Sequence, residues 1–242
     1  LYRSAADMKR RNALGVLPVY NPEQAAPQVI YAESLVEKME RALGCRIHHC
    51  GGGNMPGMQV GERFIPIKLA LSVCNMASLN RLAPYHGSVL EIGAGTGFLA
   101  GLFTILHRAP YHLVDLPIVA VMQAYLLACN RGEELLWLSG EGPSMTARIY
   151  VHGLGRPNVP FALVINQDSL PEMPAQIMDG YLEYLTENLY YGGLFYSVNQ
   201  ESRRSGQGCV HTAMRDYPQM RLRHRAPNWA RAGYVEEVWE KA

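Results

Sequence analysis

Three glycines follow a run of apolar residues in the segment VLEIGAGTGFLAG, residues 89–101. Gly93, Gly95 and Gly97 stand where a strand must turn into a helix. Because glycine has no Cβ atom, it adopts positive φ angles readily and lets a ligand lie directly against the backbone. The spacing and position of these glycines therefore predict a ligand-binding turn.

The residues around the glycines restrict which ligand the turn can hold. A dinucleotide fingerprint needs a small residue three places after its second glycine, so that the helix packs closely on the strand. Phe98 occupies that place, which disfavours NAD or FAD. One acidic residue, Glu91, precedes the glycines, and another, Asp115, ends the next predicted strand in YHLVD.

The spacing E-x-G-x-G-x-G resembles motif I of the class I S-adenosylmethionine-dependent methyltransferases. This resemblance implies S-adenosylmethionine as the cofactor and S-adenosylhomocysteine as the product. It implies that Glu91 helps to place the amino group of the methionine moiety. It also implies that Asp115 takes both ribose hydroxyls, since a carboxylate offers two acceptors at the spacing of a vicinal diol. A glycine turn kept only for tight packing is the alternative. The cofactor-binding residues implied in this way are Glu91, Gly93, Ala94, Gly95, Gly97, Phe98, Asp115, Leu116, Asn166 and Gln167.

Polar residues end the buried apolar run FALVIN and follow it in QDSLPE. Ligands of a doubly wound sheet bind beyond the carboxyl ends of the strands, so we expect residues 166–172 to project into the cleft where the methyl group leaves sulfur. An alcohol acceptor needs a general base, and the catalytic candidates, in order, are Asp168, Glu172 and His211. Alternatively, Asp168 is an N-cap of a helix that begins near Pro171.

A narrower resemblance rests on VINQDSLPEM, GGLFYSVNQES and the terminal RAPNWARAGYVEEVWE, and covers roughly Gly87 to Glu240. These segments are similar to the sugar O-methyltransferases of glycan and natural-product biosynthesis. In that group the fourth strand ends in Asn-x-Asp-Ser, the fifth ends near Asn-x-Glu, and an Arg-x-Pro-x-Trp hairpin closes the fold. The resemblance implies O-methylation of a hydroxyl on a sugar or glycosylated small molecule.

Two rival functions stay open on the sequence. One is an O- or N-methyltransferase that acts on a non-sugar metabolite, such as a polyketide or an amino compound. The other is a catalytically inactive cofactor-binding protein that serves as an assembly partner. Turnover of S-adenosylmethionine with candidate acceptors separates an enzyme from a binding protein.

The elements that must position these residues begin at Gly87, where short apolar runs alternate with helix-period segments. Apolar strands that alternate with helices indicate a parallel sheet covered on both faces. We therefore predict an α/β protein with the Rossmann-like class I methyltransferase fold. Its mostly parallel, doubly wound sheet ends in an antiparallel hairpin. Residues 1–82 form an N-terminal helical cap on the substrate side, and residues 83–242 form the S-adenosylmethionine-binding domain.

Hydrophobic periodicity predicts further details of these elements. Ser34 is a candidate N-cap for an N-terminal helix, and the glycine-rich residues 45–62 are expected to be irregular. Apolar faces suited to covering the sheet are predicted in residues 99–106 and 178–189. A further such face comprises Ile118, Val121, Met122 and Tyr125.

Composition excludes some partners and favours others. Charged residues make up 18% of the 242 residues, below roughly 25% in an average chain, which favours apolar surface in a ligand pocket or a homo-oligomer interface. A formal net charge of +1 gives the protein no strong positive field that would attract a phosphate backbone, so nucleic acid is disfavoured as a partner. No apolar run reaches the roughly 18 residues of a membrane span, and the N-terminus lacks the apolar core of a signal peptide. A soluble, cytoplasmic protein without a membrane partner is expected.

The segment CRIHHC contains Cys45, His48, His49 and Cys50, and sulfur with imidazole is zinc-ligand chemistry. Four ligands so close together cannot easily face one tetrahedral centre, and no second CxxC or HxxxH follows. We therefore predict no metal site. We interpret the segment as a loop whose histidines form local hydrogen bonds or contact the acceptor. Gly51–Gly53 are expected to mark a flexible lid.

Alternating arginines near the C-terminus are typical of one face of an antiparallel strand. Arg221, Arg223 and Arg225 are interpreted as a solvated sheet edge, with an anionic acceptor such as a nucleotide sugar as the alternative. Trp229 and Trp239 are expected to serve packing.

Overall fold

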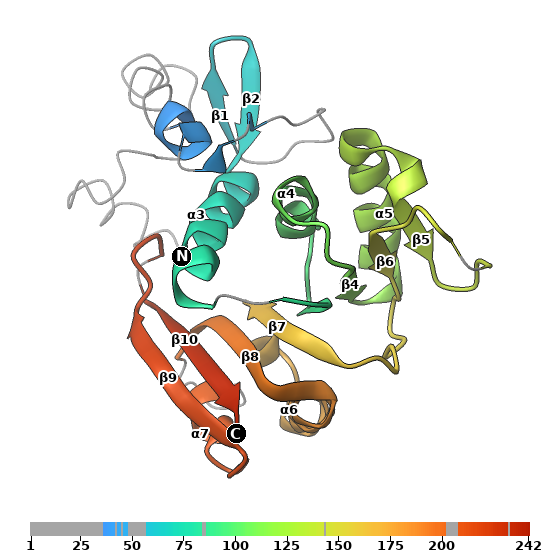
Figure 1. Cartoon of the computed structure of the whole chain (residues 1–242). Helices are drawn as coiled ribbons and strands as arrows, with labels where there is room; N and C mark the ends of the chain where they lie inside the picture. Colours follow the sequence, from blue (N-terminus) through green and yellow to red (C-terminus); the bar gives the residue numbers. More distant parts are fainter. Residues whose placement is uncertain are drawn as a thin grey trace.

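A central sheet of eight strands dominates the computed structural model of the chain (Figure 1). The structure describes residues 36–41, 43, 44, 46, 47, 57–83, 86–142, 144–201, 208–231 and 233–242. The strand order is β5-β6-β4-β3-β7-β8-β10-β9. Neighbouring strands are parallel from β5 to β8, and β10 is antiparallel to both β8 and β9. The predicted mostly parallel sheet with a terminal antiparallel hairpin is confirmed. Its strands are β3 (Val89–Ile92), β4 (Tyr111–Val114), β5 (Leu136–Leu138), β6 (Ile149–Val151), β7 (Phe161–Gln167), β8 (Leu189–Gln200), β9 (Met220–Pro227) and β10 (Tyr234–Lys241).

Helices cover both faces of this sheet, and each face has its own apolar core. Side chains of α3, α4 and α5 pack in one core, and those of α6 and α7 pack in the other. Strands buried on both faces explain why the sequence shows continuous apolar runs instead of alternation. The helices are α3 (Ile67–Leu82), α4 (Phe98–Leu106), α5 (Pro117–Arg131), α6 (Ala175–Asn188) and α7 (Val210–Met214), with 3₁₀ turns η2 (Glu133–Leu135) and η3 (Leu170–Glu172).

The N-terminal region departs in part from expectation. An antiparallel hairpin of β1 (Gly57–Val60) and β2 (Arg63–Pro66) begins inside the stretch expected to be irregular. The chain is also helical at residues 36–41 and 43. Val36, Met39 and Val73 lie in the same core as the sheet residues of that face. The described part of this region therefore shares one apolar core with the sheet, and the domain boundary at residue 82 stays a prediction.

Several expectations fall on residues that the structure does not describe. They are the Ser34 cap, the lid Gly51–Gly53 and, apart from two residues, the CRIHHC segment. Among the described residues there is no group of three His, Cys, Asp or Glu side chains that could hold a metal ion. Within the same residues, every helix falls short of the length and apolarity that a bilayer crossing requires.

The predicted orientation of α5 is wrong. Its apolar face, expected to pack on the sheet, is exposed, with Ile118 at 75% and Val121 at 67%. Met122 and Tyr125 are exposed as well. The helix instead buries Ala120, Gln123, Leu126 and Leu127. The reason is that periodicity shows that residues share a face but does not show which neighbour that face meets.

Candidate active site

A cavity of about 330 Å³ opens at the carboxyl ends of β3, β4 and β7. From β3 the chain continues to β4, β5 and β6 on one side of that strand and then returns to β7 on its other side, which makes this the topological switch point of the sheet. Ligands of open α/β sheets bind at such points. The cavity is lined by these residues from the sequence prediction: Glu91, Gly93, Ala94, Gly95, Asp115, Gln167, Asp168 and Glu172.

The glycine turn joins β3 to α4, and its three glycines differ in what they require. All have positive φ angles, of 71° at Gly93, 57° at Gly95 and 71° at Gly97. A Cβ atom at Gly93 would lie 2.0 Å from Oγ of Ser169, and one at Gly97 would lie 3.1 Å from the side chain of Leu127. A Cβ atom at Gly95 would meet nothing within 4 Å. Packing therefore accounts for the outer glycines, whereas the middle one borders open space.

Asp115 ends β4 and faces the glycine turn. Its Oδ2 accepts hydrogen bonds from the backbone N–H of Gly95 and from Nε2 of Gln123, each at 2.9 Å. Its Oδ1 accepts one from the backbone N–H of Leu116 at 2.8 Å. A carboxylate has about four acceptor sites. Binding both hydroxyls of a diol therefore requires one of these three donors to move.

Glu91 lies in the middle of β3 and is buried, with 3% of its surface exposed. The hydroxyl of Tyr111 donates a hydrogen bond of 2.8 Å to its Oε2. Burial raises the pKa of Glu91 to about 8 against the effect of this hydrogen bond, and the charge of Asp115 adds to the rise. Glu91 is therefore mainly protonated at neutral pH. A cationic group in the cavity would favour its ionised form.

Asn166 does not project into the cleft as expected. It is fully buried in β7 and is not among the lining residues. Its Nδ2 donates to the carbonyl of Ile92 at 2.9 Å and to Oγ of Ser169 at 2.6 Å, and its Oδ1 accepts from Nδ2 of Asn199. These bonds join β7 to the neighbouring strands β3 and β8. The next residue, Gln167, does line the cavity, where it accepts a hydrogen bond from Nδ2 of Asn75.

Asp168 lies at the end of β7 in the left-handed region, with φ of 70°. Its Oδ2 is 2.7 Å from Nη1 of Arg231, in the β9–β10 turn, and 3.6 Å from Nζ of Lys68, on α3. The capping alternative is not supported, because α6 begins at Ala175, and neither α6 nor η3 has a side-chain cap hydrogen bond. Asp168 is thus the meeting point of three distant chain segments.

The other two candidate bases lie in different places. Glu172, in η3, lines the cavity and is exposed. His211, on α7, does not line it. Its Nδ1 is 2.6 Å from Oε1 of Glu237, and its ring lies against Trp239. His211 is therefore positioned by the packing of α7 on β10, outside the site.

Three residues implied as cofactor ligands also lie outside this cavity. Gly97 and Phe98 line a smaller groove of about 140 Å³ between α4 and α5. Leu116, at the start of α5, is 57% exposed. The sequence reasoning in turn missed lining residues from α3 and from the β9–β10 turn, which are Lys68, Leu71, Ser72, Asn75 and Arg231.

Two arginines of β9 pair with carboxylates of their own chain. Arg223 donates from Nε and Nη2 to the carboxylate of Glu240, at 2.7 Å each. Arg225 contacts Glu201 and Glu237. Because β9 is the edge strand and neither arginine lines the cavity, the structure favours the sheet-edge interpretation.

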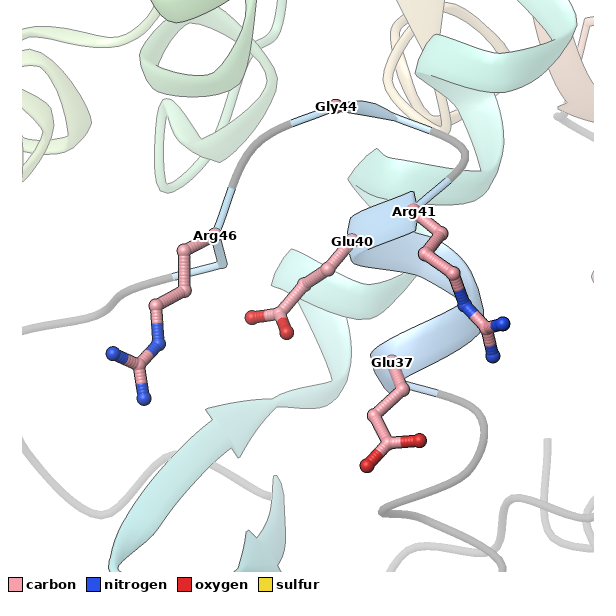
Figure 2. A pocket seen from close by; sticks show the side chains of 5 residues that line it. All are labelled: Glu37, Glu40, Arg41, Gly44 and Arg46. Atoms are coloured by element: carbon pink, nitrogen blue, oxygen red, sulfur yellow. The ribbon is translucent and has the colours of Figure 1, made fainter.

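A second hollow, of about 450 Å³, lies over the N-terminal helix (Figure 2). Its lining side chains spread apart on an open surface, and Arg41 and Arg46 point away from each other. Glu40 is bound by Nη1 of Arg63 and by the backbone N–H of Ile47. Although this hollow is larger, its described residues form no set of groups suited to chemistry, so the candidate site is the cavity at the switch point.

The sheet order, the glycine turn and the cavity at the switch point together define the Rossmann-like fold of the class I methyltransferases. No family model and no curated protein matches the chain. Solved methyltransferase structures do match. The mitomycin 7-O-methyltransferase MmcR matches with a TM-score of 0.54 and 11% identity, over 73% of this chain and 54% of its own. The glycopeptide N-methyltransferase MtfA matches with a TM-score of 0.51 and 17% identity, over 72% of this chain and 90% of its own.

A third similar structure is an S-adenosylmethionine-dependent methyltransferase from Clostridium acetobutylicum ATCC 824. It matches with a TM-score of 0.50 and 10% identity, over 73% of this chain and 92% of its own. MtfA has also been solved as a complex with S-adenosylmethionine. At these identities the likeness establishes the fold, and the chain spans about half the length of MmcR.

Proposed function

We propose that this protein is an S-adenosylmethionine-dependent methyltransferase that acts on a hydroxyl group of a sugar or glycosylated small molecule. The observation that carries the proposal is that one cavity at the switch point contains both the glycine turn with Glu91 and Asp115 and the carboxylates Asp168 and Glu172. The fold it shares with methyltransferases, including MtfA with its bound S-adenosylmethionine, supports the same conclusion.

The half of the cavity formed by β3, β4 and the glycine turn suits the cofactor. Asp115 offers a carboxylate for the ribose hydroxyls. Glu91 offers a buried carboxyl group for the ammonium of the methionine moiety, whose positive charge would favour ionisation. The open space in front of Gly95 lets the ligand lie against the backbone.

The opposite half suits a hydroxylated acceptor. In the transfer, a lone pair of the acceptor oxygen forms the bond to the methyl carbon, and the electrons of the broken carbon–sulfur bond stay on sulfur. The hydroxyl proton moves to Asp168, the leading base, while Glu172 assists it or binds a neighbouring hydroxyl. Alignment of the reacting atoms supplies much of the rate.

Substrate contacts from the N-terminal segment are part of this proposal. Lys68, Ser72 and Asn75, all on α3, line the acceptor half. Their polar side chains support a substrate-side role for residues 1–82. The sugar assignment rests on the resemblance of the segments that form β7, β8 and the β9–β10 hairpin.

Two measurements test the proposed function. Calorimetry should show S-adenosylhomocysteine binding and no binding of NAD. Incubation with S-adenosylmethionine and an extract of small molecules should yield a product whose mass rises by one methylene group, and NMR identifies the methylated atom. A product methylated on a nitrogen atom, or on a hydroxyl group that does not belong to a sugar, would contradict the proposed acceptor class. Binding without any turnover would indicate a cofactor-binding partner protein.

A further inference from the structure

Among the described residues that line the cavity are two cations, Lys68 and Arg231, and both lie in the acceptor half. Nη1 of Arg231 and Nζ of Lys68 converge on one oxygen of Asp168, at 2.7 and 3.6 Å. The Arg231 side chain is only 14% exposed, and its guanidinium stacks over the ring of Tyr234 at 3.5 Å. Lys68 is far more accessible, at 64%. Arg231 is therefore the desolvated member of the pair, and Asp168 is its carboxylate partner.

This partnership conflicts with proton uptake by Asp168. When the acceptor oxygen forms its bond to the methyl carbon, the hydroxyl proton moves to the carboxylate of Asp168 and neutralises it. Arg231 then faces a neutral group, although a guanidinium removed from water is strongly disfavoured without a partner. Glu172 is exposed and has no ion pair with Arg231 among the described residues. A neutral acceptor brings no charge that could replace that of Asp168.

We propose that the acceptor is a hydroxy acid whose carboxylate binds Arg231 and Lys68 beside the hydroxyl that is methylated. The inference rests on the proposed function and narrows its substrate class, within sugars to uronic-acid types. The planar guanidinium of Arg231 matches a carboxylate in geometry. By taking over both cations, the acceptor releases Asp168 to accept the proton. A neutral analogue leaves Asp168 held in its ion pairs, so the same contacts discriminate between acids and neutral alcohols.

The experiment compares matched acid and neutral probes for binding to the protein saturated with S-adenosylhomocysteine. A suitable pair is the methyl glycoside of glucuronic acid with methyl glucoside, of which only the first carries a carboxylate. We expect the acid to bind at least about tenfold more tightly than the neutral glycoside. Arg231→Gln should abolish this preference, and Lys68→Gln, at an exposed position, should weaken it. Arg223→Gln is the matched control, because that arginine pairs with Glu240 outside the cavity.

A second measurement needs no acceptor and no cofactor. Asp168→Asn removes the internal carboxylate, so acetate should bind this variant about tenfold more tightly than the original protein. Adding Arg231→Gln to Asp168→Asn should abolish that gain. Because this titration is made without S-adenosylhomocysteine, its result is separate from the test of cofactor binding.

Several outcomes would overturn the inference. They are equal binding of acid and neutral probes, an acid preference that survives Arg231→Gln, and no gain in acetate binding on Asp168→Asn. A further outcome concerns the carboxylate of the cofactor. Arg231→Gln could weaken the binding of S-adenosylhomocysteine but leave the binding of 5′-methylthioadenosine, which lacks the amino-acid moiety, unchanged. That result would show that the cations bind the carboxylate of the cofactor instead. Failure of the original protein to bind S-adenosylhomocysteine would count against the proposed function itself.

Discussion

The two halves of the cavity are built in different ways. The cofactor half comes from one continuous stretch, residues 89–122, in which a strand, a glycine turn, a helix, a second strand and the start of α5 follow one another. The acceptor half joins α3, the end of β7 and the β9–β10 turn through the contacts of Asp168 with Lys68 and Arg231. Backbone geometry fixes the first half and side-chain ion pairs fix the second, so substitutions should separate cofactor affinity from turnover.

The largest expected effect is on turnover. Asp168→Asn keeps the size of the side chain but removes the proposed base, so kcat should fall by about 10² to 10⁴ while the affinity for S-adenosylhomocysteine changes little. The measurement is methyl transfer at saturating cofactor, together with calorimetry. His211→Gln is the control, because His211 lies outside the cavity, and its kcat should stay near that of the original protein.

A normal kcat in Asp168→Asn would show that the acceptor half has no base at this position. Glu172 would then be the remaining candidate, since it is the other carboxylate among the described lining residues on that side. A loss of kcat in His211→Gln would contradict the placement of His211 outside the site.

A matched pair of glycine substitutions should separate packing from ligand contact within the cofactor half. Gly93→Ala and Gly95→Ala both place a Cβ atom at a positive φ angle, but only the first collides with Ser169. Gly93→Ala should lower the free energy of unfolding by about 3 kcal/mol, from strain and overlap together. Gly95→Ala should lower it by about 1 kcal/mol.

Thermal or denaturant unfolding measures both values. The bulkier Gly95→Val should in addition abolish the binding of S-adenosylhomocysteine, because its side chain enters the space in front of the turn. A folded Gly95→Val protein that binds normally would contradict the motif interpretation. Equal stability losses for the two alanine variants would contradict the difference in packing.

The sequence allowed the geometry of the proposed cofactor half to be predicted because its contacts are local. A carboxylate before the glycines, the glycines themselves and a carboxylate at the next strand end require only a strand, a turn and a helix in the right order. The alternation of apolar runs with helices was likewise sufficient for the central sheet. Asn166 was placed wrongly because a polar residue at a strand end can face either the ligand or a neighbouring strand.

The acceptor half could not be predicted in the same way. Arg231 is far from Asp168 in sequence, and its segment carries no local sign that its guanidinium reaches the end of β7. The order Asp-Ser-Leu-Pro-Glu suited capping, but the chain first makes the 3₁₀ turn η3 and begins α6 only at Ala175. The exposed face of α5 shows the same limit, because an apolar stripe does not specify its neighbour.

An effect on cofactor affinity, confined to the cofactor half, is expected from Asp115. Asp115→Ala should weaken S-adenosylhomocysteine binding by roughly 1.5 to 3 kcal/mol, the scale of charge-assisted hydrogen bonds. When an acceptor substrate is present, the kcat of Asp115→Ala at saturating cofactor should change much less than the kcat of Asp168→Asn. Calorimetry checks the affinity, and an unchanged value in the variant would remove the ribose role.

A pH-dependent effect on stability is expected from Glu91, because burial raises the pKa of its carboxyl group from 4.5 to about 8. In the unfolded chain this carboxyl group loses its proton near its ordinary pKa, whereas in the folded protein it keeps the proton until about pH 8. The folded state therefore binds more protons between these values, and stability falls as pH rises through this window, by at most about 1.4 kcal/mol per pH unit from this group. Glu91→Gln, which stays neutral, should flatten the decline between pH 6 and 8.

Cofactor binding should reveal the same proton. If the ammonium of S-adenosylhomocysteine pairs with Glu91, the carboxyl group ionises on binding and releases a proton at pH 7, where it is mainly protonated in the empty cavity. Calorimetry in buffers of different ionisation enthalpy should then show release of up to about one proton per molecule bound. Glu91→Gln should bind the ligand without this release, and Asp168→Asn, as the control from the acceptor half, should retain it. A binding enthalpy that is independent of the buffer in the original protein would show that Glu91 stays protonated in the complex, and its role would then be that of a hydrogen-bond donor instead of a counter-ion.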